Sequence, residues 1–142
     1  MTHRLLANVT CVAVEGRGLL IQGPPASGKS TLALALIDRG AVLVGDDGVT
    51  LEGRSDRLWA LPPPNIAGKL EIRGIGIVTV PTTSAPLALA LSLGAGADRL
   101  PGPERREIGG HAIPILTFDP AAPAAPLRAE WALRLYGLAG ET

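Results

Sequence analysis

One stretch of the chain brings glycine, lysine and serine together at the spacing of a phosphate-binding loop. Residues 23–30 are Gly-Pro-Pro-Ala-Ser-Gly-Lys-Ser and match the pattern G-x-x-x-x-G-K-[ST] in full. In such a loop, backbone N–H groups surround phosphate oxygens, the lysine reaches the β- and γ-phosphates, and the last hydroxyl contacts Mg²⁺. The residues expected to bind a nucleotide are therefore Gly23, Pro24, Pro25, Ala26, Ser27, Gly28, Lys29 and Ser30.

The residues on either side of this loop favour a functional motif over the alternative, a glycine-rich turn that ends in Lys-Ser by chance. Leu19-Leu20-Ile21 supplies the strand expected before such a loop. The run 31–37, apolar apart from Thr31, supplies the helix expected after it. That helix is expected to begin near Lys29 and to end at Gly40. The positive end of its dipole would then face the phosphates.

Two adjacent acids follow the next apolar segment. Residues 41–44 are Ala-Val-Leu-Val, a continuous apolar run that predicts a strand buried on both faces and completes a β-α-β unit. Asp46 and Asp47 come shortly after it. Ligands bind beyond the carboxyl ends of strands in α/β sheets, so these acids could serve a metal ion and a nucleophile beside the loop. A turn into a strand at 49–51 is the alternative interpretation, and both can hold at once.

Apolar segments and turn residues predict the elements that position these groups. In the first half of the chain, strands are expected at residues 8–15 and 19–22, paired as a hairpin. Two further short strands are expected between residues 51 and 61, on either side of the polar turn 52–57, with Trp59 on the core face. Residues 67–78 mix charges with apolar residues and two glycines, as a solvated hairpin does.

In the second half, a strand is expected at 86–93, an exposed loop at 95–110 and a further strand at 111–118. Because Pro114 has no N–H group, the last of these is best placed at a sheet edge. The final element is a helix at 127–138, which is expected to dock on the core through apolar residues at helical spacing. These residues are Leu127, Trp131, Leu135 and Leu138.

Composition excludes several classes of function. The 142 residues suffice for one domain, and thirteen basic residues balance thirteen acidic ones. With zero net charge and 3% aromatic residues, binding of nucleic acid or of an anionic membrane surface is not expected. The N-terminus does not resemble a signal peptide, no apolar run is long enough for a membrane span, and the single cysteine, Cys11, permits no intrachain disulfide. A cytoplasmic protein is expected.

Three segments, taken in order, resemble the catalytic domain of HPr kinase/phosphorylase. They are residues 23–30, the stretch Leu-Val-Gly-Asp-Asp at 43–47, and Leu-Glu-Ile-Arg-Gly-Ile-Gly-Ile at 70–77. The third resembles that family's own signature and is more specific than the loop. The resemblance covers about residues 5–118 and does not include the N-terminal domain of longer members. The chain is thus expected to be the short, single-domain bacterial form, with one catalytic domain over residues 1–142.

The resemblance implies both a fold and a reaction. The fold would be α/β, a P-loop kinase domain similar to the nucleotide-binding core of phosphoenolpyruvate carboxykinase, with a mixed sheet and packed helices. Members of the family use ATP and Mg²⁺ to phosphorylate a serine on HPr, the phosphocarrier protein of the sugar phosphotransferase system, or on its nitrogen-related paralogue. Many also remove that phosphate with inorganic phosphate. Longer members form hexamers, so the chain is expected to form a homo-oligomer.

The same resemblance implies roles for individual residues. Lys29 would bind phosphate, and Ser30 and Glu71 would lie around the metal. One of Asp46 and Asp47 would be the general base on the acceptor serine, and adjacent acids leave open which of the two it is. Arg73 would hold the phosphates or the charge of the transition state. The expected catalytic residues are therefore Lys29, Asp46, Asp47 and Arg73.

Three departures from the family pattern bear on the reverse reaction. Asn8 stands where the family has a catalytic histidine, and an amide cannot shuttle a proton near neutral pH. Thr31 replaces the acid that commonly follows the loop serine. The Pro/Ala-rich segment 120–126 replaces a basic segment that longer members use for phosphate removal. The expectation is a kinase whose phosphorylase activity is weak or absent.

Two other functions are compatible with the same motifs. The chain could be a small-molecule P-loop kinase, which would phosphorylate a metabolite without a carrier protein. It could also be a catalytically degenerate sensor that binds ATP with Mg²⁺ and transfers nothing, and Asn8 favours this alternative.

Overall fold

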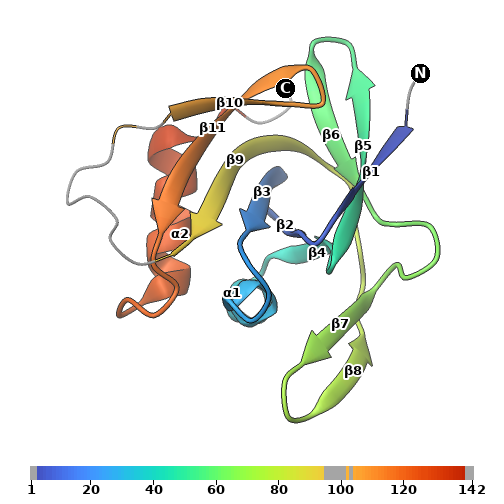
Figure 1. Cartoon of the computed structure of the whole chain (residues 1–142), viewed down its shortest axis with the longest axis vertical. Coiled ribbons are helices and arrows are strands. Elements are labelled where there is room, and N and C mark those ends of the chain that lie inside the picture. Colours follow the sequence, from blue (N-terminus) through green and yellow to red (C-terminus); the bar gives the residue numbers. More distant parts are fainter. Residues whose placement is uncertain (1–2, 95–101, 103, 140–142) are drawn as a thin grey trace.

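The computed structural model of the chain describes residues 3–94, 102 and 104–139 and shows an α/β protein with a mixed sheet and two helices (Figure 1). In the first half, the strands are β1 (His3–Ala7), β2 (Thr10–Val14), β3 (Arg17–Gln22), β4 (Val42–Gly45), β5 (Gly48–Arg54) and β6 (Arg57–Leu61). They are followed by β7 (Lys69–Ile72), β8 (Gly76–Thr79), β9 (Ala85–Leu93), β10 (Glu104–Ile108) and β11 (His111–Phe118). The helices are α1 (Lys29–Asp38) and α2 (Ala125–Tyr136).

The long strand β9 joins two layers of strands. Along one side, β9 pairs in parallel with β3, which continues to β2 and β4. Along its other side, the start of β9 pairs with β6 and its end pairs in parallel with β11. Strands β1, β5 and β6 therefore form a layer that leaves the main sheet at the start of β9, whose bend is visible in Figure 1.

The main sheet is buried on both faces because side chains of successive residues point in opposite directions. On one face, Leu19 and Ile21 of β3 lie in a core cluster with residues of α1 and α2. On the other face, Leu20 lies in a second core cluster with Val49 and Leu58 from the β5–β6 layer. This explains why β2, β3 and β9 are nearly continuous apolar runs.

The predicted β-α-β unit is present, with one strand inserted in it. Strands β3 and β4 are both antiparallel to β2, so they are parallel to each other with β2 between them. Helix α1 crosses from one to the other and ends at Asp38, and the predicted C-terminal glycine, Gly40, follows Arg39 with a φ of 109°. The N–H groups of Gly40 and Ala41 donate to the carbonyls of Ile37 and Leu36, a common C-terminal cap.

Residues 67–79 form a hairpin that is separate from the main sheet (Figure 1). Strand β7 packs against α1 through Leu70, which is fully buried in the helix-side core. The predicted hairpin is therefore confirmed.

Several expectations about the outer strands are wrong. Sequence pattern did not predict β1, which pairs with β5. Residues 104–108 form β10 instead of a loop, because β11 offers them an antiparallel partner; residues 95–101 and 103 lie outside the described part. Strand β11 lies between β9 and β10 and is not a sheet edge; Pro114 precedes the residues that pair with β9. Trp59 faces away from the core, and the Arg54 guanidinium lies 4.5 Å from its ring centroid.

The predicted docking face of the last helix is also largely wrong, although Leu138, two residues after the end of α2, does pack against the core. Leu127, Trp131 and Leu135 are 41%, 55% and 69% exposed. Helix α2 instead buries Ala129 and Leu133, whose face allows a close approach to the core. Glu130 on this buried face pairs with Arg39 at the end of α1 at 3.0 Å, and this hydrogen-bonded partner raises the pKa of Arg39. Neither this helix nor α1 is long and apolar enough to cross a membrane, and these are the helices of the described part.

Two leucines on α2 test which face docks. Leu133→Ala removes a side chain that is 1% exposed, so it should lower the free energy of unfolding by about 2–5 kcal/mol. Leu135→Ala should change that free energy by less than about 0.5 kcal/mol, because the side chain already contacts water. Urea unfolding of both variants measures the difference, and equal losses would contradict this packing.

Candidate active site

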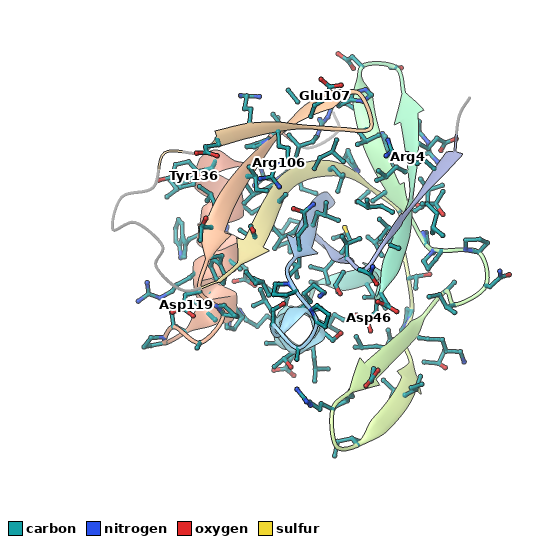
Figure 2. All side chains as sticks on the ribbon, viewed as in Figure 1. Arg4, Asp46, Arg106, Glu107, Asp119 and Tyr136 are labelled. Carbon is teal, nitrogen blue, oxygen red and sulfur yellow. The ribbon has the colours of Figure 1, made fainter. Side chains whose placement is uncertain are left out.

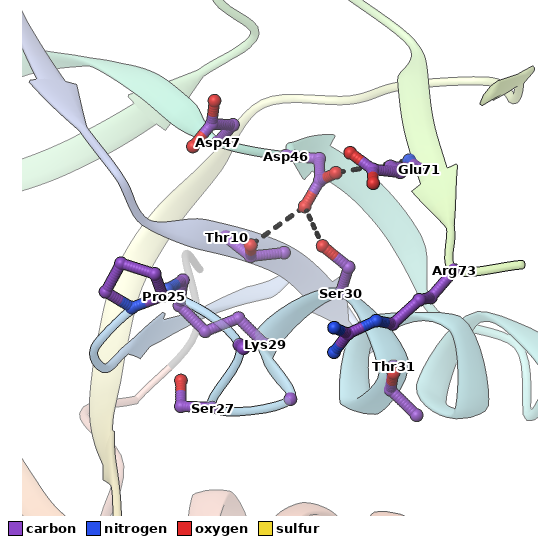
Figure 3. A pocket seen from close by; sticks show the side chains of 12 residues that line it. Thr10, Pro25, Ser27, Lys29, Ser30, Thr31, Asp46, Asp47, Glu71 and Arg73 are labelled. Carbon is purple, nitrogen blue, oxygen red and sulfur yellow. Dashed lines mark hydrogen bonds between the residues drawn. The ribbon is translucent and has the colours of Figure 1, made fainter. Parts of the chain in front are cut away.

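A pocket of about 420 Å³ opens where β3 and β4 end, between α1 and the β7–β8 hairpin (Figure 3). Figure 2 shows Asp46 in this region, with Asp119 on the other side of α1. The pocket contains most of the site residues predicted from sequence, together with two threonines. Its lining is Thr10, Pro25, Ala26, Ser27, Gly28, Lys29, Ser30, Thr31, Asp46, Asp47, Glu71 and Arg73. Gly23 and Pro24, also predicted, are not part of this lining.

The loop between β3 and α1 is shaped by short-range geometry. The N–H group of Ser27 donates to the carbonyl of Pro24 at 3.1 Å, which closes a turn. Gly28 adopts φ 101°, a conformation that residues with a Cβ rarely take, and helix α1 begins at the next residue. The first turn of the helix therefore points its free N–H groups into the pocket.

Lys29 is folded back onto the loop. Its Nζ atom donates to the carbonyl oxygens of Gly23 at 2.8 Å and Pro24 at 3.1 Å. These two residues thus serve the site through Lys29, although neither lines the pocket. The lysine is already held beside the helix N-terminus, where an anion would be attracted.

The carboxylate of Asp46 is the most extensively bonded group of the pocket. Its Oδ1 atom accepts hydrogen bonds from the hydroxyls of Ser30 at 2.7 Å and Thr10 at 2.9 Å, and its Oδ2 atom accepts one from the N–H group of Glu71 at 3.3 Å (Figure 3). Asp46 is 7% exposed and Thr10 is 1% exposed. The carboxylate is therefore fixed between β2, α1 and β7.

Asp47 has a different environment, although it is the next residue. Gly45 and Gly48 approach so closely that a Cβ on Gly45 would lie 2.2 Å from the Gly48 carbonyl oxygen. Within this tight turn, Asp47 adopts φ 62°, which aspartate tolerates better than most residues, and its side chain is exposed. Its carbonyl accepts a hydrogen bond from the N–H group of Asn8 at 3.1 Å. In Figure 3 its carboxylate points away from Ser30.

The hairpin contributes Glu71 and Arg73. Leu70 anchors β7 in the core, and the bond from the Glu71 N–H group to Asp46 ties the strand to the pocket. Arg73 lies in the turn after β7, and in Figure 3 its side chain extends toward the start of α1, near Thr31. Among the described residues, Arg73 has no ion-pair partner, so its guanidinium can bind an incoming anion.

The oxygen atoms in the pocket fit Mg²⁺. The hydroxyl of Ser30 and the carboxylates of Asp46 and Glu71 are hard oxygen donors, which Mg²⁺ prefers. The described residues contain no group of three or more His, Cys, Asp or Glu side chains placed to hold a metal ion. Mg²⁺ is commonly bound in proteins by one or two carboxylates, with phosphates and water as its other ligands.

Thr10 was missed as a site residue. A signal for it existed, because the predicted hairpin between residues 8–15 and 19–22 places the start of the first strand next to the end of the second. The register confirms this, since Thr10 pairs with Ile21, two residues before Gly23. A threonine in a strand that is otherwise apolar, at the sheet edge where the loop begins, is thus a candidate site residue.

Known proteins resemble this chain in sequence and in overall fold. The sequence model of the family described as HPr Serine kinase C-terminal domain matches residues 1–84, more than half of the 142-residue chain. The solved structure of the Hpr(Ser) kinase/phosphatase from Coxiella burnetii superposes with a TM-score of 0.80 at 30% identity, covering 92% of this chain and 94% of that one.

Curated relatives carry the name HPr kinase/phosphorylase. The protein from Clostridium tetani is 45% identical over 71 residues, which are 50% of this chain and 23% of the relative. The protein from Streptococcus equinus is 37% identical over 131 residues, covering 82% of this chain and 42% of the relative. The chain thus spans less than half the length of these two relatives.

Substitution of Thr10 tests the order around Asp46. Thr10→Val keeps the side-chain shape but removes the hydroxyl that donates to Oδ1 of Asp46, so the carboxylate loses one of its three hydrogen bonds. We expect the apparent affinity for Mg²⁺, measured by titration with a non-hydrolysable ATP analogue present, to fall about three- to tenfold, in line with the loss of one hydrogen bond that contributes about 1 kcal/mol. Thr10→Ser should restore most of it, and an unchanged affinity in Thr10→Val would contradict the role.

Proposed function

Because the chain belongs to the HPr Serine kinase C-terminal domain family, we propose that it transfers the γ-phosphoryl group of ATP to a serine of an HPr-like phosphocarrier protein. One observation carries the proposal. The hydroxyl of Ser30, the last residue of the loop motif, is bonded to the carboxylate of Asp46 at 2.7 Å. This bond joins the phosphate-binding motif to an acid at the end of β4, the strand that follows the helix, as phosphoryl transfer from a nucleotide requires.

The phosphates of ATP would lie against the loop and the start of α1. Lys29 would exchange the carbonyls of Gly23 and Pro24 for phosphate oxygens, a short movement because its ammonium already lies beside the loop. Arg73, which belongs to the turn after β7, would bind the transferring phosphoryl group from the side of the β7–β8 hairpin. Ser30 and Asp46, with Glu71, would hold Mg²⁺, which when bound neutralises charge on the β- and γ-phosphates.

The two acids receive different roles in this proposal. Asp46 already accepts three hydrogen bonds and is buried, so it is suited to orient Ser30 and the metal site. Asp47 is exposed and is suited to meet an acceptor that arrives from solvent. Its carboxylate would take the proton of the serine hydroxyl as the serine oxygen bonds to the γ-phosphorus and the bond to ADP breaks.

The reverse reaction is proposed to be weak. It would need a group beside Asp47 that supplies or relays a proton, and position 8 is adjacent, since the Asn8 N–H group bonds to the Asp47 carbonyl. The asparagine amide can orient a neighbour but does not exchange protons near neutral pH. The segment 120–126 is rich in proline and alanine and offers no basic side chain for inorganic phosphate.

The cytoplasmic location expected from the sequence and the homo-oligomer implied by the family resemblance stay predictions. Sedimentation velocity would measure the oligomeric state of the chain.

Transfer to a carrier protein is the direct test. With γ-labelled ATP and Mg²⁺, we expect label on wild-type HPr-like carrier and none on a carrier whose acceptor serine is alanine. Lys29→Ala should slow transfer by about 10²–10³ because a charge that binds the reacting phosphates is lost. The fold should remain, since the loop turn is closed by its own backbone. Release of phosphate from phosphorylated carrier with inorganic phosphate should be slower than transfer.

Other results of the same assay would point elsewhere. Label on a metabolite without any carrier would identify a small-molecule kinase. Binding of ATP with no transfer to any acceptor would identify a sensor. Undiminished transfer by Lys29→Ala would remove the loop from the mechanism.

Single substitutions of the two acids separate their roles. Asp47→Asn should lower kcat by about 10²–10⁴ with little change in ATP affinity, because the base acts only on the acceptor hydroxyl. Asp46→Asn should weaken binding of ATP with Mg²⁺ about tenfold as well as lowering kcat, because the carboxylate orders the loop serine. Steady-state kinetics and calorimetry measure both, and wild-type turnover in the two variants would show that the pair is only a turn.

A further inference from the structure

The third residue of α1, Thr31, is neutral at a position where an acid would favour the helix. Helix α1, whose residues are all described, has no acid in its first turn, and Gly28 at its N-cap provides no side-chain hydrogen bond. Acidic side chains are favourable near a helix N-terminus because they face the positive end of the helix dipole. Thr31 is exposed and lines the pocket but brings no charge to it. The positive end of α1 is therefore not neutralised by a side chain of its own first turn.

The β7–β8 hairpin carries the cation that an acid at this position would attract. Arg73 is exposed and lines the same pocket, and in Figure 3 its side chain extends toward Thr31. Within the described part of the chain, no ion pair joins its guanidinium to a carboxylate. A carboxylate at position 31 would attract both this guanidinium and the helix dipole. Two of the positive groups that face the pocket would then be neutralised by the protein itself.

The outer part of the hairpin is held by few contacts. Leu70 is fully buried and anchors β7, whereas residues 73–77 are exposed, and the glycines among them have open space where a Cβ would lie. The Glu71 N–H group donates to Asp46 at 3.3 Å, which is long for a hydrogen bond. A group that binds Arg73 can therefore change how firmly the hairpin is held against α1.

The charges of the pocket make a further acid unfavourable for a phosphate ligand. The lining already contains three acids, Asp46, Asp47 and Glu71, and two cations, Lys29 and Arg73. An additional carboxylate would repel the phosphates directly. It would also bind one of the two cations that the phosphates need.

From these observations we propose that residue 31 determines nucleotide affinity by controlling Arg73. Threonine leaves the guanidinium free, so the phosphates of the nucleotide join Arg73 to the start of α1 and hold the hairpin in place. This inference rests on the nucleotide binding that the proposed function includes, and it adds a residue that sets affinity and the order of the hairpin. Thr31 acts through Arg73 and is thus a positioning residue.

Thr31→Glu and Thr31→Gln are nearly equal in size and differ in charge, so each is the control for the other. Calorimetry with a non-hydrolysable ATP analogue and Mg²⁺ should give a Kd about tenfold higher for Thr31→Glu than for Thr31→Gln. In proteins that also carry Arg73→Gln, this ratio should fall to about threefold or less, because no guanidinium remains for the carboxylate to bind. The Tm of Thr31→Glu should not lie below that of Thr31→Gln, since an acid is favourable in the first turn.

Hydrogen exchange of the hairpin amides provides a readout that does not depend on transfer. Without nucleotide, the amides of residues 71–77 should exchange more slowly in Thr31→Glu than in Thr31→Gln, because the introduced carboxylate holds Arg73 against α1. In wild type, the ATP analogue with Mg²⁺ should slow the same amides by about threefold or more. In Arg73→Gln, saturating analogue should slow them much less.

Each result supports or overturns the inference. Equal Kd values for Thr31→Glu and Thr31→Gln would overturn it. A Kd ratio that is the same with and without Arg73→Gln would also overturn it, because the carboxylate would then act on the phosphates alone. Hairpin amides that exchange equally with and without the analogue in wild type would show that the phosphates do not hold the hairpin. The expected binding differences without transfer to any carrier would contradict the proposed kinase function and leave this inference intact.

Discussion

The carboxylate of Asp46 joins segments that are far apart in the sequence. It accepts hydrogen bonds from Thr10, Ser30 and the N–H group of Glu71, which belong to β2, α1 and β7. A buried carboxylate is costly unless it is hydrogen-bonded, so these donors must stay in place for the site to persist. The loop, the strand end and the hairpin are therefore positioned by one another.

The sheet explains why these segments meet. Strand β2 lies between β3 and β4 and runs in the opposite direction, so its start lies where the other two end. Thr10, the loop and Asp46 consequently share one edge. Apolar layers on both faces of the main sheet fix this edge: helices on one face and the β5–β6 layer on the other. Few aromatic residues are needed because leucine, valine, isoleucine and alanine fill both layers.

The sequence was informative wherever the signal was local. The loop, the capped helix after it and the β2–β3 hairpin could be predicted, since glycine positions and apolar runs determine them. The separate environments of Asp46 and Asp47 could not, because they depend on the tight turn between Gly45 and Gly48 and on donors from distant strands.

The predicted buried faces of α2 and β6 were wrong because large apolar side chains were expected to lie in the core. The larger apolar residues of α2 are exposed, with the Arg134 guanidinium 4.9 Å from the Trp131 ring centroid, whereas small Ala129 is fully buried. Trp59 similarly stacks with Arg54 outside the core. An arginine over an indole ring stabilises an exposed tryptophan, and sequence periodicity contains no information about that contact. Strand β10 likewise depends on its partner β11.

A double-mutant cycle between Ser30 and Asp46 tests most directly whether they act as one unit. The measurement is the binding free energy of a non-hydrolysable ATP analogue with Mg²⁺ to wild type, Ser30→Ala, Asp46→Ala and the double variant. Because the two side chains share a hydrogen bond of 2.7 Å, the double variant should lose little more than the worse single variant, with a coupling energy of about 1–3 kcal/mol. Losses that add, with no coupling, would show that Asp46 and the loop serine bind independently and would contradict this account.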